Sequence, residues 1–233
     1  MAEEIRERLA RVRDQIARAA ERANRKAEDI TLIAVSKTFS PPTIQQAVDA
    51  GALDLGENRV QEAAGKVSLI KSGNLRWHLI GHLQSNKARQ AVSLFDVIHT
   101  VDSPELARRL DRFAGEQGRK PVALVQVDLA HEPTKSGADE AELPAIIEAL
   151  DAASNLDFRG LMTLPPFFDS PEQARSYFRK LQEILESLNR SRAPERRLTE
   201  LSMGMSHDFH VAIEEGATMV RVGTAIFGSR EKK

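Results

Sequence analysis

Strand-like and helix-like segments alternate along this chain from residue 30 almost to its end, and this alternation constrains the possible folds more than any other feature. Apolar runs rich in β-branched residues are typical of buried parallel strands, and apolar residues recurring every three or four positions are typical of helices. We expect strands at residues 30–36, 52–56, 76–82, 96–101, 121–129, 158–164, 198–203 and 218–222. We expect helices near residues 41–50, 58–71, 84–93, 103–117, 139–153, 170–189 and 207–215.

Eight strands that alternate with helices predict the α/β class and a closed (β/α)8 barrel of the TIM type. An open doubly wound sheet is the competing architecture. Against it, the glycine-rich dinucleotide-binding turn is absent after the first strand, where Lys37-Thr38-Phe39-Ser40 stands instead. No low-complexity linker divides the chain, so we expect one barrel domain over residues 1–233.

An additional helix is predicted over residues 2–28, ahead of the barrel. Its apolar stripe is short for a coiled coil, so we expect the helix to pack on the barrel. The stripe consists of Ile5, Leu9, Val12, Ile16 and Ala20.

The composition excludes several classes of function. The 233 residues carry a net charge of −1, so no basic field favours nucleic acid or an anionic membrane as a partner. The absence of cysteine excludes disulfides, thiolate zinc sites, iron–sulfur clusters and a cysteine nucleophile. No stretch is apolar and long enough to span a bilayer, and the charged N-terminal segment lacks the apolar region of a signal peptide. We therefore expect a cytoplasmic protein.

Lys37 stands at the C-terminal end of the first predicted strand, just before the strand-breaking pair Pro41-Pro42. A lysine is costly to bury unless it is paired or its pKa falls, and a desolvated amine can attack an aldehyde and hold it as a Schiff base. Taken alone, a lysine at a strand end more often extends to solvent. The other strand ends favour the chemical interpretation.

Polar residues stand at the C-terminal ends of several predicted strands, where parallel barrels build their sites. These residues include Lys37, Glu57, Asn58, Arg59, His82, Asp128, Ser206, His207, Asp208, Arg221, Gly223 and Thr224. Each is weak evidence alone. Together they predict a small-molecule site at the mouth of the barrel.

The last two predicted strands indicate that the ligand is anionic. Ser206-His207-Asp208 comes directly before a predicted helix, whose first N–H groups form an anion site, and Gly223-Thr224 adds a close backbone approach and a hydroxyl. The alternative is that Ser206 or Asp208 only caps a helix. A lysine that can form an imine, together with a phosphate cradle, points to pyridoxal 5′-phosphate (PLP) as the cofactor.

Arg221 lies two residues before Gly223, on a strand whose alternation turns it into the barrel. If it faces the pyridine nitrogen of PLP, it keeps that nitrogen unprotonated, because arginine is a permanent donor without an acceptor. Reactions that form a carbanion are then less favoured. The alternative is an ordinary ion pair with a carboxylate such as Glu57 or Asp128.

Other chemistries are less well supported. The histidines His78, His82 and His207 lie in different predicted loops or strand ends, which does not favour a metal site. No Gly-x-Ser-x-Gly elbow surrounds a serine, which argues against a nucleophilic hydrolase.

Six motifs together resemble the pyridoxal phosphate homeostasis protein family, over about residues 5–228. They are Ile33–Lys37, Gly56–Gln61, Trp77–Lys87, Gly160–Met162, Leu201–Asp208 and Val220–Gly228. The resemblance implies the PLP-binding barrel of the alanine racemase N-terminal domain, known as fold type III.

The same resemblance implies a role for each site residue. It implies that Lys37 carries PLP as an internal aldimine, and that Arg221 faces the pyridine nitrogen. It also implies that Asn58 lies near the ring hydroxyl, that the phosphate is held by Ser206, Gly223 and Thr224, and that Met203 and His82 line the pocket.

The family is regarded as non-catalytic, so the resemblance implies a protein that buffers PLP and delivers it to apo PLP-dependent enzymes. The chain stops at Lys233, and Tyr177, its one tyrosine, is predicted on an outer helix; two-base racemisation therefore lacks its second base. An open mouth would also admit water. We expect a monomer, because the lid domain through which alanine racemases dimerise is absent.

Two alternatives remain. One is a PLP-dependent racemase or lyase of narrow specificity, with Lys37 as one base and His82 or a substrate group as the other. The other is a phosphosugar-type barrel enzyme without PLP, in which Lys37 acts as an aldolase-like amine.

Overall fold

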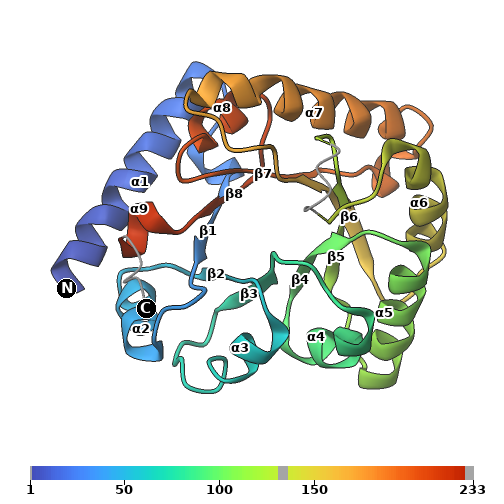
Figure 1. Cartoon of the computed structure of the whole chain (residues 1–233), viewed down its shortest axis with the longest axis horizontal. Helices are drawn as coiled ribbons and strands as arrows, with labels where there is room; N and C mark the ends of the chain where they lie inside the picture. Colours follow the sequence, from blue (N-terminus) through green and yellow to red (C-terminus); the bar gives the residue numbers. More distant parts are fainter. Residues whose placement is uncertain (1, 131–135, 229–233) are drawn as a thin grey trace.

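The computed structural model describes residues 2–130 and 136–228, and its strands form one closed parallel barrel in chain order (Figure 1). β8 closes the barrel on β1, with Arg221 beside Ile33. The strands are β1 (Thr31–Val35), β2 (Asp54–Glu57), β3 (Arg76–Leu79), β4 (Val97–Val101), β5 (Val122–Val127), β6 (Asp157–Thr163), β7 (Glu200–Met205) and β8 (Met219–Val222). The predicted (β/α)8 barrel of the TIM type is therefore confirmed.

Helices surround the strands (Figure 1). They are α1 (Ala2–Arg22), α2 (Pro41–Asp49), α3 (Val60–Ala64), α4 (Ala88–Leu94), α5 (Pro104–Gln117), α6 (Leu143–Asp151), α7 (Arg175–Asn189), α8 (Phe209–Glu214) and α9 (Thr224–Phe227). Short 3-10 turns occur at Ala27–Asp29, Ser85–Lys87, Glu140–Glu142, Pro171–Ala174 and Pro194–Arg196. The helix predicted over residues 58–71 is shorter than expected, because only Val60–Ala64 is α-helical and hydrogen-bonded turns follow it.

The N-terminal helix also ends earlier than predicted, at Arg22 instead of residue 28. Asn24 has a φ of 53° and donates its N–H to the carbonyl of Glu21 at 3.0 Å, while Arg25 donates to the carbonyl of Ala20 at 2.9 Å. This pair of bonds around a left-handed residue is a Schellman motif, which satisfies the last carbonyls of a helix and stops it. The buried apolar stripe of α1 packs this helix against α2, α8 and α9.

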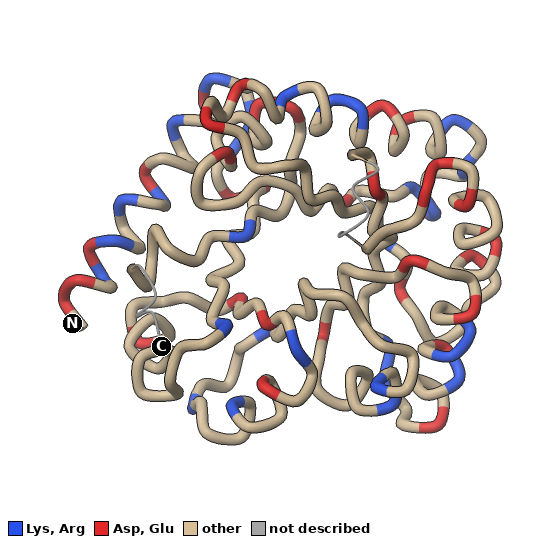
Figure 2. The backbone as a smooth tube through the Cα atoms, viewed as in Figure 1, with Lys and Arg blue, Asp and Glu red and all other residues tan. Residues whose placement is uncertain are grey.

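The two faces of the strands have different surroundings. Inside the barrel, Ile33, Leu124, Met162 and Met219 form a small apolar cluster. The opposite faces of the strands belong to the larger core shared with the helices, which is why the residues on those faces are mostly apolar. Figure 2 shows most Lys, Arg, Asp and Glu residues on the outer helices, with a few on the inner ring. In the described part of the chain, no helix has the length and apolar character needed to cross a membrane.

Candidate functional site

Lys37 begins a sharp turn directly after β1 and is half-buried. The turn is closed by a 3.2 Å hydrogen bond from the Phe39 N–H to the Ser36 carbonyl, and Thr38 within it has a φ of 71°. A β-branched residue rarely adopts this left-handed conformation, which costs about 1–3 kcal/mol and occurs where the surrounding structure enforces it. The backbone that carries Lys37 is therefore held in a strained shape.

A buried ion-pair network lies behind this turn. The Nζ of Lys66 donates to the Ser36 carbonyl at 2.9 Å, to Oε1 of Glu57 at 2.8 Å and to Oε1 of Glu62 at 2.6 Å. The Ser36 hydroxyl donates to the same Glu57 oxygen at 2.6 Å. Burial raises the pKa of Glu57, and the bonds from Lys66 and Ser36 partly oppose that rise.

The network contacts the backbone on both sides of Lys37. Lys66 bonds the carbonyl before it, and the carboxylate of Glu62 accepts the N–H of Thr38 after it. Sequence reasoning missed Lys66. Its four-residue spacing from Glu62 is a readable signal for a helical ion pair. The contact with Ser36 comes only from the way the turn after α3 packs at the end of β1.

The ends of β7 and β8 meet where the phosphate cradle was predicted. The Gly223 N–H donates to the Ser206 hydroxyl at 3.1 Å. Within α9 the Ile226 N–H bonds to the Gly223 carbonyl at 2.9 Å, so the N–H groups of Thr224 and Ala225 precede the first intrahelical bond. The N–H groups of Thr224 and Ala225, together with the hydroxyls of Ser206 and Thr224, are the kinds of donor that bind a phosphate.

Asp208 directly precedes α8, but its side chain makes no capping hydrogen bond to that helix. Asp208 is buried, and its carboxylate accepts the N–H of Met205 at 2.6 Å, which closes the loop between β7 and α8. Ser206 bonds across to Gly223 instead and connects two strand ends.

Arg221 lies inside the barrel and is 3% exposed. Its guanidinium donates to the Ser202 hydroxyl at 2.6 Å and to the Thr163 carbonyl at 2.9 Å. Burial lowers the pKa of Arg221 to about 10, with the charge of Asp208 opposing this shift, so the side chain remains charged at neutral pH. Glu57, suggested by the sequence as a partner for Arg221, pairs with Lys66 instead.

Asn58 and His82 line one pocket of about 570 Å³ beside the ends of β2 and β3, together with Arg59 and Lys87. His82 is half-exposed, and its Nδ1 lies 3.3 Å from the Asp102 carboxylate. Burial raises the pKa of Asp102, and the charge of His82 opposes this rise.

The predicted site residues thus stand at the ends of five adjacent strands, in the order β7, β8, β1, β2 and β3. Met203 is the exception. It is fully buried in the core shared with the helices, whereas its neighbour Ser202 bonds inside the barrel, so the structure does not bring Met203 together with the others.

The histidines considered for a metal site serve other contacts. His78 bonds to Asp54 and His99 inside the barrel, and His207 contacts the Asp169 carbonyl. Among residues 2–130 and 136–228, no group of three or more His, Asp or Glu side chains could hold a metal ion.

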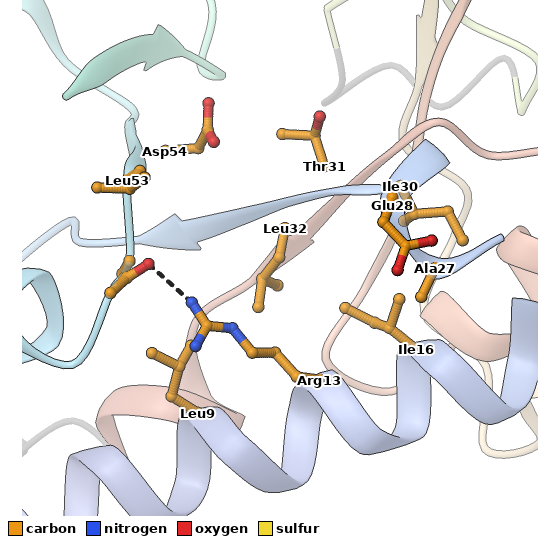
Figure 3. Close-up of a pocket in the computed structure, with 12 residues that line it drawn as sticks. Leu9, Arg13, Ile16, Ala27, Glu28, Ile30, Thr31, Leu32, Leu53 and Asp54 are labelled. Atoms are coloured by element: carbon orange, nitrogen blue, oxygen red, sulfur yellow. Dashed lines mark hydrogen bonds between the residues drawn. The ribbon is translucent and has the colours of Figure 1, made fainter. Parts of the chain in front are cut away.

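A separate pocket of about 450 Å³ opens at the opposite end of the barrel, between α1 and the starts of β1 and β2 (Figure 3). Leu9, Arg13 and Ile16 of α1 line one side, and Arg13 donates to the Gly51 carbonyl at 2.7 Å. Asp54 borders the same pocket.

Three comparisons place the chain among known proteins. Residues 8–231 match the family described as alanine racemase, N-terminal domain. The pyridoxal phosphate homeostasis protein of Aquifex aeolicus is 41% identical over 225 residues, which cover 97% of this chain and 98% of the relative.

Among solved structures, PipY of Synechococcus elongatus without PLP has a TM-score of 0.87 and 45% identity, over 96% of this chain and 100% of PipY. The PipY structure with PLP bound has a TM-score of 0.85 and 44% identity at the same coverage. An alanine racemase of Clostridium difficile, 18% identical with a TM-score of 0.72 over 99% of this chain and 61% of the racemase, shares the fold.

Proposed function

Because the chain belongs to the pyridoxal phosphate homeostasis protein family, within the wider family of the alanine racemase N-terminal domain, we propose that it binds PLP at the barrel mouth and serves intracellular PLP homeostasis. The observation that carries this proposal is the position of Lys37. It follows β1 in a strained turn, beside the end of β8 on one flank and the end of β2 on the other.

The residues around Lys37 fit the chemical groups of PLP. The Lys37 amine would condense with the aldehyde of the cofactor, releasing water, and so hold the cofactor covalently. Ser206 and Thr224, with the amide N–H groups at the start of α9, would hold the phosphate. Arg221 is a permanent donor and suits a pyridine nitrogen that stays unprotonated.

The mouth offers contacts for the rest of the ring. Asn58 would lie near the ring hydroxyl, and His82 shares the Asn58 pocket. PLP bound in this way supplies a reactive aldehyde and an electron-accepting ring.

The distribution of acids and bases supports a carrier over an enzyme. Tyr177 is the only tyrosine of the chain, and it lies on α7 with its ring 5.9 Å from that of Phe168. A racemase needs a second acid/base on the face of the substrate opposite the lysine. We therefore propose that the protein keeps PLP and surrenders it to apo PLP-dependent enzymes, as a cytoplasmic monomer.

Reduction with borohydride tests the attachment of PLP. We expect the purified protein incubated with PLP to show a visible absorption band, and peptide mass mapping after reduction to place a pyridoxyl group on Lys37. Lys37→Ala should lose both signals. Lys120→Ala is the matched control, because Lys120 is exposed and lies just before β5, at the opposite end of the barrel.

Two outcomes would contradict the proposal. A wild-type protein that stays colourless and unmodified with PLP would favour an aldolase-like amine at Lys37. A pyridoxyl group retained in Lys37→Ala would place the attachment on another lysine.

Deuterium exchange at the α-carbon of amino acids, measured by NMR in heavy water with the PLP-loaded protein, separates carrier from enzyme. We expect no exchange above that of Lys37→Ala. Sustained exchange or racemisation that depends on Lys37 would instead make the protein a PLP-dependent enzyme.

A further inference from the structure

A continuous line of hydrogen bonds crosses the inside of the barrel from β2 to β8. His78 on β3 contacts Asp54 through Nε2 at 2.8 Å and His99 on β4 through Nδ1 at 2.9 Å. His99 in turn contacts the Ser202 hydroxyl through Nδ1 at 2.8 Å, and that hydroxyl accepts from Arg221 at 2.6 Å. We call Asp54, His78, His99, Ser202 and Arg221 the barrel relay.

The two ends of the barrel relay impose the same direction on its hydrogen bonds. A carboxylate only accepts, so Asp54 requires a proton on Nε2 of His78. With one proton on each imidazole, His78 accepts at Nδ1 from Nε2 of His99, and His99 accepts at Nδ1 from the Ser202 hydroxyl. Arginine only donates, so Arg221 leaves the Ser202 proton directed at His99.

The charge states agree with this direction. Burial tends to raise the pKa of Asp54, but the hydrogen bonds from His78 and Arg76 outweigh burial and lower it. Burial, aided by the charge of Arg221, lowers the pKa of His99 well below its ordinary value, so His99 is neutral.

The Asp54 end of the barrel relay is more accessible to solvent than its middle. His78, His99 and Ser202 are fully buried, whereas the Asp54 side chain is 13% exposed and borders the pocket of Figure 3. Arg76 contacts Asp54 from outside at 2.7 Å, and Asp208 is the charged group that acts on Arg221 at the other end. The barrel relay therefore joins a carboxylate at the N-terminal end of the barrel to the guanidinium below the mouth.

We propose that His78, His99 and Ser202 are positioning residues that hold Arg221 in one orientation and couple it to the charge of Asp54, so that a change at the far end of the barrel alters the electrostatic environment of the PLP ring nitrogen. This inference rests on the proposed PLP site and names the residues that regulate it. A buried polar network that only stabilises the barrel could contain the same hydrogen bonds. The tests therefore measure the coupling between Asp54 and Arg221 as well as stability.

The first test uses the protein without PLP. Nitrogen-15 NMR of the histidine rings should show a single neutral tautomer, protonated at Nε2, for both His78 and His99. A proton on Nδ1 of His99, or rapid exchange between tautomers, would overturn the proposed direction of the barrel relay. This measurement needs no substitution, so it stands even if a variant fails to fold.

The second test uses the PLP-loaded protein. Asp54→Asn removes a charge far from the mouth and should shift the pH midpoint of the visible band by about 0.5 pH unit or more. Ser202→Ala, which breaks the barrel relay next to Arg221, should also shift it. Thr100→Val is the matched control, because its buried hydroxyl bonds to the Gly81 carbonyl outside the relay, and its midpoint should stay at the wild-type value.

The double variant Asp54→Asn with Ser202→Ala gives the decisive comparison. If the coupling runs through the barrel relay, Asp54→Asn adds no further shift once Ser202 is gone. Additive shifts, or an unchanged midpoint in Asp54→Asn, would overturn the inference while PLP binding itself stands. A wild-type protein that takes up no PLP would overturn the proposed function, and this inference with it.

Discussion

Lys66 is the residue that most directly connects the buried interior to the Lys37 turn. Its ammonium is held by two carboxylates and one carbonyl, and its side chain is only 8% exposed. A buried ion pair adds little net stability by itself, but removal of one partner leaves an uncompensated charge inside the protein. The Glu57 carboxylate is fully buried, and its second oxygen, Oε2, has no hydrogen-bond partner in the described structure, so it tolerates the loss of Lys66 badly.

Lys66→Met should therefore lower the free energy of unfolding by about 3 kcal/mol, because Glu57 then has to be protonated or remain buried as an unpaired charge. Urea denaturation measures the change. Lys71→Met, at an exposed position, should leave stability within about 0.5 kcal/mol of the wild type.

The pair Lys66→Met with Glu57→Gln should recover part of the loss, because it removes both charges. Equal stability of Lys66→Met and the wild type would show that the network is not required for folding. Faster loss of PLP from the Lys66→Met protein than from Lys71→Met would support its role behind the Lys37 turn.

At the scale of elements, α1 shows how one residue sets the end of a helix. The apolar stripe could continue beyond Arg22, but Asn24 turns the backbone into the left-handed region and directs the chain into β1. Glycine adopts the left-handed conformation most easily, because it has no Cβ to clash. Among the other residues, asparagine tolerates this conformation better than most.

Asn24→Ala should destabilise the protein by about 1 kcal/mol, since alanine is disfavoured at a φ of 53°. Asn24→Gly should be as stable as the wild type or slightly more stable. Thermal unfolding of the three proteins makes the comparison, and a stable Asn24→Ala variant would mean that the helix end can be rebuilt without a left-handed residue.

At the scale of the whole molecule, the barrel interior combines an apolar cluster with the polar barrel relay, and this makes folding sensitive to pH. The pKa of His99 in the folded state lies well below its ordinary value. Below about pH 6.5 the unfolded chain therefore binds a proton that the folded chain does not. The stability associated with neutral His99 is present above that pH and is lost as the pH falls.

We expect the free energy of unfolding to fall between pH 6.5 and 5, with a contribution from His99 of up to about 1.4 kcal/mol per pH unit. His99→Gln should be less stable at pH 7 but should have a shallower slope. His207→Gln, at an exposed histidine, should keep the wild-type slope. Urea titrations at several pH values test this, and equal slopes for the wild type and His99→Gln would exclude His99 as the source.

Much of the barrel was predictable, because the patterns that specify its strands and helices lie within short segments of the sequence. Apolar runs and helical periodicity predicted eight strands in the right places, with errors at the ends of elements such as 58–71, where turn chemistry and packing compete with periodicity. The end of α1 had a signal in Asn24, but asparagine enters the left-handed region only where the following chain requires it.

The sequence by itself determined the parallel barrel and the set of strand ends that carry Lys37, Asn58, Ser206, Arg221 and Gly223, because strand order and strand direction follow from the alternating pattern. Only the tertiary structure decided which buried polar groups meet. Ser36 and Lys66, which are in contact, lie 30 positions apart in the sequence. His99 and Ser202, which are also in contact, lie 103 positions apart. Such contacts depend on how the barrel closes and on the register of its strands, and no local pattern in the sequence encodes them.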